Sequence, residues 1–130
     1  EIGSNDGYLL KFYKKAGIPV LGIDPAQNVA EVAEKVNGVP TITDYFDVDL
    51  ARSIESKFSC MDIIHANNVL AHIGGINDFV KGVSILLKPE GVCIIEVPYI
   101  KDLIDKLSSD YNIFAPIKVD NIFLFCYILK

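Results

Sequence analysis

The sequence predicts an α/β fold, a three-layer sandwich in which helices cover a mostly parallel sheet. Short apolar runs alternate with segments whose apolar residues recur at helical spacing, the pattern of strand–helix–strand units around a parallel sheet. Two final apolar runs, residues 111–114 and 122–129, are separated by the turn-prone residues 119–121 and predict a C-terminal antiparallel strand pair. The 130 residues suffice for one core, so a single domain spanning 1–130 is expected.

The composition narrows the class of partner. The formal charge is −5 and the basic residues form no stripe, which disfavours a nucleic-acid partner and favours a small molecule. The longest apolar run, residues 122–129, is too short to span a bilayer, and no segment has the pattern of a signal peptide. Cys60, Cys93 and Cys126 are widely separated, as expected of buried thiols in a reducing compartment rather than of a metal site. A cytoplasmic protein without metal or membrane partner is expected.

The first half of the chain predicts two helices after a strand end at residues 1–3. Residues 6–16 predict a helix ending at Gly17, because apolar side chains recur on one face: Leu9, Leu10, Tyr13 and Ala16. A buried strand at residues 19–23 follows, and the next helix is expected to use Asp24 as its N-cap and Pro25 as its first residue. Its buried face is predicted from residues at helical spacing: Val29, Val32, Ala33 and Val36.

The second half continues the same alternation. Strands are expected at residues 40–43, 61–66 and 92–97, and helices at 47–57 and 100–107. Between the last two of these strands a helix is predicted from an apolar face: Ile76, Phe79, Val80, Val83, Leu86 and Leu87. A turn at residues 88–91 is expected to separate that helix from the next strand.

Glycines frame the first strand-to-helix turn, which reads Glu1-Ile2-Gly3-Ser4-Asn5-Asp6-Gly7. Glycine lets backbone N–H groups approach a ligand without a Cβ in the way, so the turn is a candidate ligand platform, with a purely structural turn as the alternative. Asp24 ends the next strand, 21 positions after Gly3. An acid at this place accepts hydrogen bonds from the ribose hydroxyls of a nucleoside, whereas capping the following helix is its alternative role.

The spacing of the glycines favours one kind of nucleoside. A dinucleotide site uses G-x-G-x-x-G, which seats a pyrophosphate on the helix N-terminus. Here three residues separate Gly3 from Gly7, and Asp6 places a carboxylate where phosphate would lie. S-adenosylmethionine carries a sulfonium and an ammonium instead of phosphate, and both cations suit the carboxylates of Glu1 and Asp6. The turn therefore favours S-adenosylmethionine over a nicotinamide dinucleotide.

Four segments of the chain carry a family resemblance. They are the turn at residues 1–7, Gly22-Ile23-Asp24-Pro25-Ala26, Ala66-Asn67-Asn68-Val69-Leu70-Ala71-His72-Ile73, and Leu87-Lys88-Pro89-Glu90-Gly91 followed by Ile95-Glu96-Val97-Pro98-Tyr99. Together they resemble the Rossmann-like core of class I S-adenosylmethionine-dependent methyltransferases. More narrowly, residues 1–107 are similar to C-methyltransferases that act on nucleotide-linked keto-deoxysugars.

This resemblance implies a role for each matching position. The turn from Gly3 to Gly7 would lie along the methionine part of the cofactor, Asp24 would hold the ribose, and Asp44-Tyr45-Phe46 would hold the adenine. Core packing is the alternative for the two aromatic residues. Asn67 and Asn68 would border the methionine tail and the methyl group. The expected cofactor-binding residues are Glu1, Gly3, Ser4, Asn5, Gly7, Asp24, Pro25, Asp44, Tyr45, Phe46, Asn67 and Asn68.

Three further polar residues have less definite roles. His65 alternates within an apolar strand and is expected to be a satisfied core or strand-end histidine. His72 lies in the loop after that strand, and its action as a base is the weaker of its two interpretations, so no catalytic residue is assigned. Glu96 interrupts an apolar strand and needs a partner if buried; a structural hydrogen bond is expected rather than catalysis.

The resembling C-methyltransferases also carry a cysteine-rich zinc module, a Tyr-His-Glu-His segment and a C-terminal substrate domain, none of which is found in these 130 residues. The sequence is therefore expected to be a piece of a longer enzyme that C-methylates a nucleotide-linked keto-sugar. The alternatives are methylation at oxygen or nitrogen, an NAD(P)-dependent oxidoreductase domain, and a cofactor-binding module without catalysis.

Overall fold

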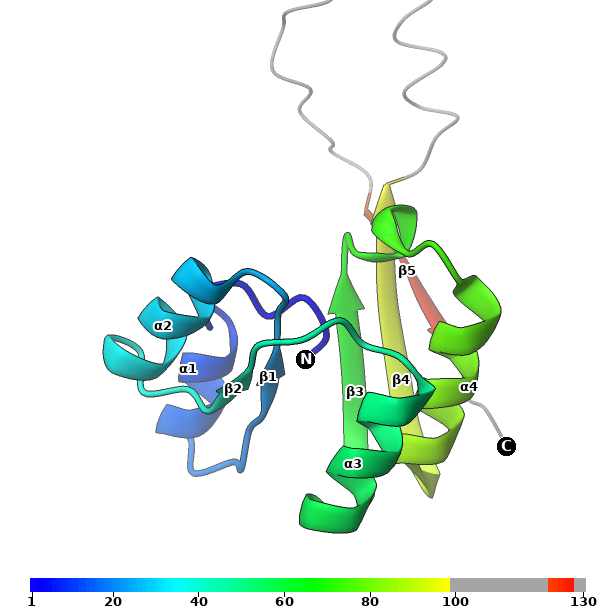
Figure 1. Cartoon of the computed structure of the whole chain (residues 1–130), viewed down its shortest axis with the longest axis horizontal. Helices are drawn as coiled ribbons and strands as arrows, with labels where there is room; N and C mark the ends of the chain where they lie inside the picture. Colours follow the sequence, from blue (N-terminus) through cyan, green and yellow to red (C-terminus); the bar gives the residue numbers. More distant parts are fainter. Residues whose placement is uncertain (99–121, 128–130) are drawn as a thin grey trace, which may run out of the picture.

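A computed structural model describes residues 1–98 and 122–127 of the chain. Helices and strands alternate along most of its length (Figure 1). In chain order the elements are α1 (Leu10–Lys15), β1 (Gly22–Ile23), α2 (Gln27–Lys35), β2 (Thr41–Ile42), α3 (Val48–Phe58), β3 (Met61–Asn67), the 3₁₀ helix η1 (Leu70–His72), α4 (Ile76–Leu86), β4 (Leu87–Pro98) and β5 (Ile122–Tyr127). The α/β fold expected from the sequence is confirmed.

The strands form a mostly parallel sheet of two parts, β1–β2 and β3–β4–β5, which are connected through Ile2. β1 pairs with β2 and β3 pairs with β4, both in parallel, whereas β5 runs antiparallel to β4. Ile2 makes parallel bridges to Ile23 on one side and to Ala66 on the other. The order across the sheet is therefore β2, β1, Ile2, β3, β4, β5. Because the first five are parallel, their carboxyl ends meet along one edge.

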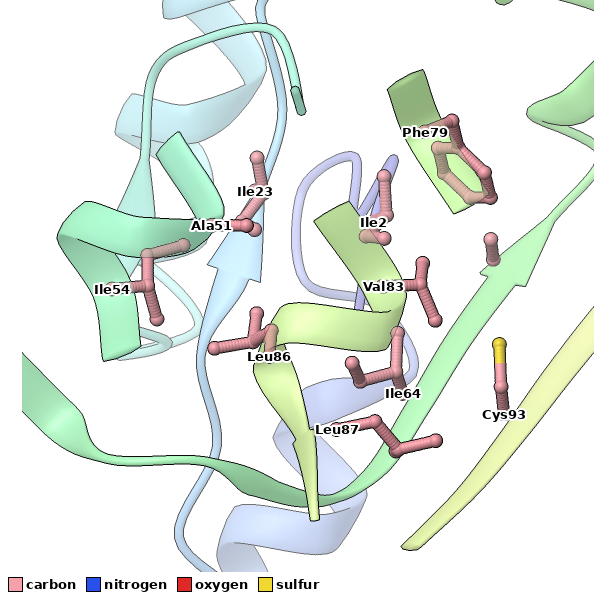
Figure 2. Packing of buried hydrophobic residues seen from close by; sticks show 11 residues of the cluster. Ile2, Ile23, Ala51, Ile54, Ile64, Phe79, Val83, Leu86, Leu87 and Cys93 are labelled. Atoms are coloured by element: carbon pink, nitrogen blue, oxygen red, sulfur yellow. The ribbon is translucent and has the colours of Figure 1, made fainter. Parts of the chain in front are cut away.

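The two faces of the sheet are covered by different helices. Successive residues of a strand point to opposite faces. On β3, Ile64 and Ala66 are buried in one cluster with residues of α3 and α4, and Figure 2 shows Ile64 near Val83 and Leu86 of α4. Ile63 and His65 point the other way and line a cavity with residues of α1. The α3–α4 layer and the α1 layer thus lie on opposite faces.

The main core lies between the sheet and the α3–α4 layer. Its buried members are Ile2, Ile23, Ala51, Ile54, Ile64, Ala66, Phe79, Val83, Leu86, Leu87 and Cys93. A smaller cluster of Leu10, Ala33 and Val39 lies under α1 and α2. No helix in the described part of the chain combines the length and the hydropathy that crossing a bilayer requires.

The first helix is shorter than predicted because the preceding turn is longer. α1 begins at Leu10 rather than at residue 6. Gly3, Asn5 and Gly7 all have φ between +52° and +74°, a left-handed conformation that interrupts a right-handed helix. The turn therefore occupies residues that hydrophobic spacing alone assigned to the helix. Of the predicted apolar face, Leu10 is buried but Tyr13 and Ala16 are exposed.

The predicted start of the second helix is wrong, and of its predicted buried face Ala33 is buried whereas Val32 and Val36 are exposed. α2 begins at Gln27, so Pro25 lies before the helix and Ala26 is its N-cap. Its buried residues are Ala30 and Ala33, whereas Val36 is 75% exposed. Small side chains face inward here because Gly7 and Val39 approach closely: a Cβ on Gly7 would lie 3.4 Å from Cβ of Ala33. The preceding strand is also shorter than predicted, since β1 contains only Gly22–Ile23.

The predicted turn at residues 88–91 lies within β4. Leu87 is the partner of Met61, and the next pairing joins Ile63 to Val92, so the segment between Leu87 and Val92 is an irregularity of the ladder rather than a break between elements. In α4 the buried residues are Phe79, Gly82, Val83 and Leu86, while the predicted face members Ile76 and Val80 are exposed. Cys93 is buried as predicted and Cys60 is half-buried. The predicted elements at 100–107 and 111–114 and the side chain of Cys126 lie outside the described residues.

Candidate functional site

The glycine turn leaves the sheet at its carboxyl edge and is held by backbone hydrogen bonds. The N–H groups of Gly3 and Ser4 donate to the carbonyl of Ile23 at 2.8 and 3.1 Å, and Gly7 N–H donates to the carbonyl of Ser4. Gly3 has φ +70°, and a Cβ added there would overlap Cγ2 of Val69. Glycine is therefore required at position 3 both by its conformation and by the close approach of the loop that follows β3.

Two turn residues, Ser4 and Gly7, are packed closely against neighbouring segments. The Ser4 side chain is fully buried against Gly22, and its Oγ has no hydrogen-bond partner among the described residues. Gly7 faces Val39, whose Cβ would lie 3.0 Å from an added Cβ. Any contact of Ser4 and Gly7 with a ligand would thus be made by their backbone. Asn5 differs, because its side chain is exposed at the turn.

Asp24 joins the turn to the next strand–helix connection. Its Oδ2 accepts a hydrogen bond from Asn5 N–H at 2.9 Å, and its Oδ1 accepts one from Ala26 N–H at 2.9 Å. The carboxylate is therefore not an N-cap of α2, which begins at Gln27 without a side-chain cap. Each carboxylate oxygen has a second lone pair, so both stay able to accept from a ligand hydroxyl.

A cavity of about 320 Å³ opens beside Gly3 at the carboxyl edge. Pro25, Asp44, Tyr45 and Phe46 line one side of it. Tyr45 is 76% exposed, and Asp44 Oδ1 accepts from Tyr45 N–H at 2.8 Å. Phe46 is half-buried, with its ring edge-on to Phe79 at a centroid distance of 5.6 Å. The core-packing interpretation therefore applies to Phe46, which still contributes to the cavity wall, but not to Tyr45.

The opposite wall of this cavity comes from the segment after β3. Val69, His72, Ile73, Gly74, Gly75 and Asp78 line it. His72 is exposed and belongs to η1, so the structure brings it to the predicted site. Sequence reasoning missed Val69, although it follows two asparagines at a strand end. The Gly74-Gly75 pair was the available signal for an open loop at this position.

A second cavity, of about 460 Å³, lies on the α1 side of the sheet. Glu1, His65, Asn67 and Glu96 contribute its polar groups, and apolar residues of α1 and the strands make up most of the rest. Asn67 Nδ2 donates to Glu1 Oε1 at 3.3 Å. Thus Glu1 and Asn67, both predicted from the sequence, lie together, but on the other side of Ile2 from the cavity beside Asp44.

Glu1 and His65 are buried next to each other. His65 Nδ1 lies 3.5 Å from Glu1 Oε1, and the Tyr13 ring is edge-on to the imidazole at 5.9 Å. Burial raises the pKa of Glu1 to about 7 and lowers the pKa of His65 to about 4. His65 is a buried histidine as predicted, but its Nδ1 has no hydrogen-bond partner among the described residues, so it is not fully satisfied.

Neither cavity is lined by a lysine or arginine among the described residues, whereas Glu1, Asp44, Asp47, Asp78 and Glu96 all contribute carboxyl groups. Asp47 and Asp78 also support the start of α3, since Asp47 Oδ1 accepts from Leu50 N–H and Asp78 Oδ2 accepts from Val48 N–H. No group of three His, Cys, Asp or Glu in the described ranges is arranged to hold a metal ion. The electrostatics of the edge suit a cationic ligand and oppose a phosphate.

Residues 1–93 match the family model described as a methyltransferase domain. The chain is 38% identical over 110 residues to the C-methyltransferase NovU of Streptomyces niveus, covering 85% of this chain and 26% of NovU. It is 27% identical over 95 residues to the ubiquinone biosynthesis O-methyltransferase of Bartonella quintana, covering 73% of this chain and 38% of that protein. The chain therefore spans about a quarter to two fifths of the length of these relatives.

The fold is similar to that of a solved methyltransferase. The S-adenosylmethionine-dependent methyltransferase from Thiobacillus denitrificans, solved in complex with S-adenosylhomocysteine, superposes with a TM-score of 0.58 at 23% identity, covering 75% of this chain and 40% of that one. Both the family match and the fold agree with the resemblance carried by the sequence motifs. The chain belongs to the methyltransferase domain family, of the class I S-adenosylmethionine-dependent type.

Proposed function

We propose that this chain is the S-adenosylmethionine-binding part of an enzyme that C-methylates a nucleotide-linked keto-sugar. The observation that carries the choice of ligand is the charge of the two cavities, whose described residues include several carboxylates and no lysine or arginine. A dinucleotide brings a pyrophosphate that this edge would repel, whereas S-adenosylmethionine brings a sulfonium and an ammonium. The similarity to NovU supports the choice of a carbon acceptor.

Each part of the cofactor has a complementary group at the edge. Asp24, with an acceptor on each carboxylate oxygen, would receive the ribose hydroxyls. The cavity between Asp44 and Phe46 offers one hydrogen-bonding edge and an aromatic face, which suit adenine. The Glu1 carboxyl and the asparagines at the end of β3 would border the amino-acid tail. These assignments make the site a cradle that runs from one cavity, across Gly3, to the other.

The contribution of these residues to methyl transfer is positioning. When bound, the cofactor supplies an electrophilic methyl group on sulfur, and the acceptor carbon becomes nucleophilic after a proton is removed next to the sugar ketone. Holding both reactants in line supplies much of the acceleration in such a reaction. His72 borders the cavity and is exposed, but its side chain has no hydrogen bond to any described residue that would orient it as a base. The removal of the proton is therefore not assigned to a described residue.

Isothermal titration calorimetry tests the choice of ligand. We expect the protein to bind S-adenosylhomocysteine and to give no heat of binding with NADH. The reverse result would show a nicotinamide-binding domain and would refute the proposal. Binding of S-adenosylhomocysteine without methyl transfer by the longer protein would instead identify a cofactor-binding module.

The acceptor is tested with a methyl-¹³C cofactor and a nucleotide-linked 4-keto-6-deoxysugar. The carbon shift of the transferred methyl group distinguishes a new carbon–carbon bond from a methyl ether. We expect a C-methyl signal from the longer protein that contains this chain. A methyl ether would instead place the protein with O-methyltransferases such as the Bartonella quintana relative.

A further inference from the structure

Asn68 has an uncommon backbone conformation at the carboxyl end of β3. Its φ is +57°, in the left-handed region that glycine enters without steric cost. Asn5 and Ser59 are the other non-glycine residues in the described ranges with positive φ. Such a conformation persists where surrounding contacts hold it, and strain of this kind clusters at ligand sites. The contacts that hold Asn68 are therefore candidates for a functional role.

Glu96 supplies these contacts from the neighbouring strand. The backbone N–H of Asn68 donates to the carbonyl oxygen of Glu96 at 2.9 Å, and Asn68 Nδ2 donates to Glu96 Oε1 at 3.0 Å. Glu96 is the register partner of Asn67 in the parallel ladder of β3 and β4, so all three residues stand at the same edge of the sheet. A single residue thus fixes both the backbone and the side chain of Asn68.

This pairing determines which atom of the Asn68 amide is available. A carboxylate only accepts hydrogen bonds, so the amide turns its nitrogen toward Glu96. Its oxygen is left as an acceptor, and it has no partner within the described part of the chain. An amide oxygen exposed at this edge is a suitable acceptor for a cationic donor such as an ammonium group.

Asn68 lies between residues that line the two cavities, although it lines neither itself. Its neighbours Asn67 and Val69 line different cavities, the first on the α1 side and the second beside Asp44. A ligand whose nucleoside lies near Asp24 and whose tail extends toward Glu1 would bring its tail to the end of β3, because Glu1 is hydrogen-bonded to Asn67 and lines the same cavity as Glu96. The tail of such a ligand, rather than its nucleoside, would come next to Asn68 and Glu96.

We propose that Glu96 is a positioning residue that, by holding Asn68, sets the affinity of the site for the α-amino-acid tail of the cofactor. Glu96 acts through Asn68: it keeps the left-handed turn in place and presents the amide oxygen to the ammonium group of the tail. The proposal rests on the proposed function and adds to it a residue that need not touch the ligand. It predicts that replacing Glu96 lowers the affinity for ligands that have the tail and leaves the affinity for ligands without it unchanged.

The test compares two ligands by calorimetry. S-adenosylhomocysteine has the amino-acid tail, and 5′-methylthioadenosine has the same nucleoside and sulfur without it. For Glu96→Leu we expect the affinity for S-adenosylhomocysteine to fall about tenfold, the scale of one lost polar contact, while the affinity for 5′-methylthioadenosine stays unchanged. For Glu96→Gln we expect a smaller loss, because glutamine keeps the acceptor but can also pair with the amide in the reversed orientation.

Two further variants complete the design. Glu90→Leu removes the same charge from the exposed beginning of the same strand and should leave both affinities unchanged. Asn68→Gly keeps the left-handed conformation without strain but removes the amide, so it should lose affinity only for the ligand with the tail, even if Glu96→Leu does not fold. Equal loss for both ligands, or no loss for either, in Glu96→Leu and Asn68→Gly would overturn the inference. Failure of the wild-type protein to bind S-adenosylhomocysteine would instead overturn the proposed function.

Discussion

Asp24 accepts a hydrogen bond from the backbone N–H of Asn5, 19 positions before it, at 2.9 Å. Its other oxygen accepts from Ala26 N–H, so one carboxylate links the glycine turn to the connection between β1 and α2. Both linked segments belong to the proposed cofactor cradle. Asp24 thus has two roles that can be separated experimentally: shaping the turn and receiving the ribose.

Replacing Asp24 by alanine is expected to weaken S-adenosylhomocysteine binding by about 1–3 kcal/mol, the cost of unpairing polar groups in a site built around them. Asp24→Asn is the matched control, because it keeps one acceptor oxygen and the side-chain size while removing the charge. Calorimetry gives the affinities, and thermal unfolding without ligand reports the turn. If Asp24→Ala lowers stability but leaves affinity unchanged, the residue serves only to fix the turn.

Gly3→Ala is expected to destabilise the protein for two reasons, the positive φ of residue 3 and the overlap of a new Cβ with Val69. Gly17→Ala isolates the first reason, because Gly17 has φ +80° but no neighbouring atom within 4 Å of a new Cβ. The conformational cost alone is roughly 1–2 kcal/mol. Chemical denaturation should show a larger loss for Gly3→Ala than for Gly17→Ala, and Val69→Ala should recover part of it in the double variant. Equal losses for the two glycine variants would mean that Val69 moves aside freely.

Two substitutions test which side of α2 is buried: one enlarges a buried residue and the other makes an exposed residue polar. Ala33 is completely buried near Gly7, so Ala33→Leu should overpack this cluster and cost about 1–3 kcal/mol of unfolding free energy. Val36 is 75% exposed, so Val36→Ser should change stability by less than about 0.5 kcal/mol. Urea denaturation of both variants decides the point. A large loss for Val36→Ser would show that Val36 is buried, as hydrophobic spacing predicted, and no loss for Ala33→Leu would contradict the tight packing of Ala33.

Substitution of His65 should change how stability depends on pH. Because burial lowers the pKa of His65 to about 4, the folded state resists the proton that the unfolded state takes up below its ordinary pKa of 6.5. The stability that His65 contributes is therefore present above that pKa and is lost as the pH falls toward 4. Burial raises the pKa of neighbouring Glu1 to about 7, so Glu1 acts in the opposite direction and favours the folded state on acidification.

Without His65, only Glu1 of this pair contributes to the pH dependence of the unfolding free energy. We expect His65→Phe to gain about 1–2 kcal/mol of stability relative to wild type when the pH is lowered from about 8 to about 5. Denaturant titrations of both proteins at the two pH values measure this difference. If the difference in stability between His65→Phe and wild type is the same at both pH values, His65 takes up its proton in the folded protein at its ordinary pKa of 6.5.

The position of Asp24 at a strand end was predictable because the physics that places it is local. An acid directly after an apolar run, such as Asp24, stands at the carboxyl edge of a parallel sheet wherever the remaining strands lie. Spacing predicted the burial of Ala33 but not the exposure of Val36, because both residues fit a helical period and only the approach of Gly7 and Val39 selects the small side chain.

Contacts between segments that are distant along the chain could likewise not be predicted from the sequence. The pairing of Asn68 with Glu96 joins residues 28 positions apart and depends on the register of β3 against β4. The irregularity after Leu87 shifts that register, and residues 88–91 by themselves indicate only a turn. Similarly, the late start of α1 follows from left-handed residues in the turn, one of which is an asparagine rather than a glycine.

A crystal structure of the protein with S-adenosylhomocysteine tests the central claim most directly. The account predicts the ribose hydroxyls within hydrogen-bond distance of the Asp24 carboxylate, the adenine in the cavity beside Asp44, and the tail on the far side of Gly3. A ligand bound elsewhere, or a ribose with no contact to Asp24, would contradict it.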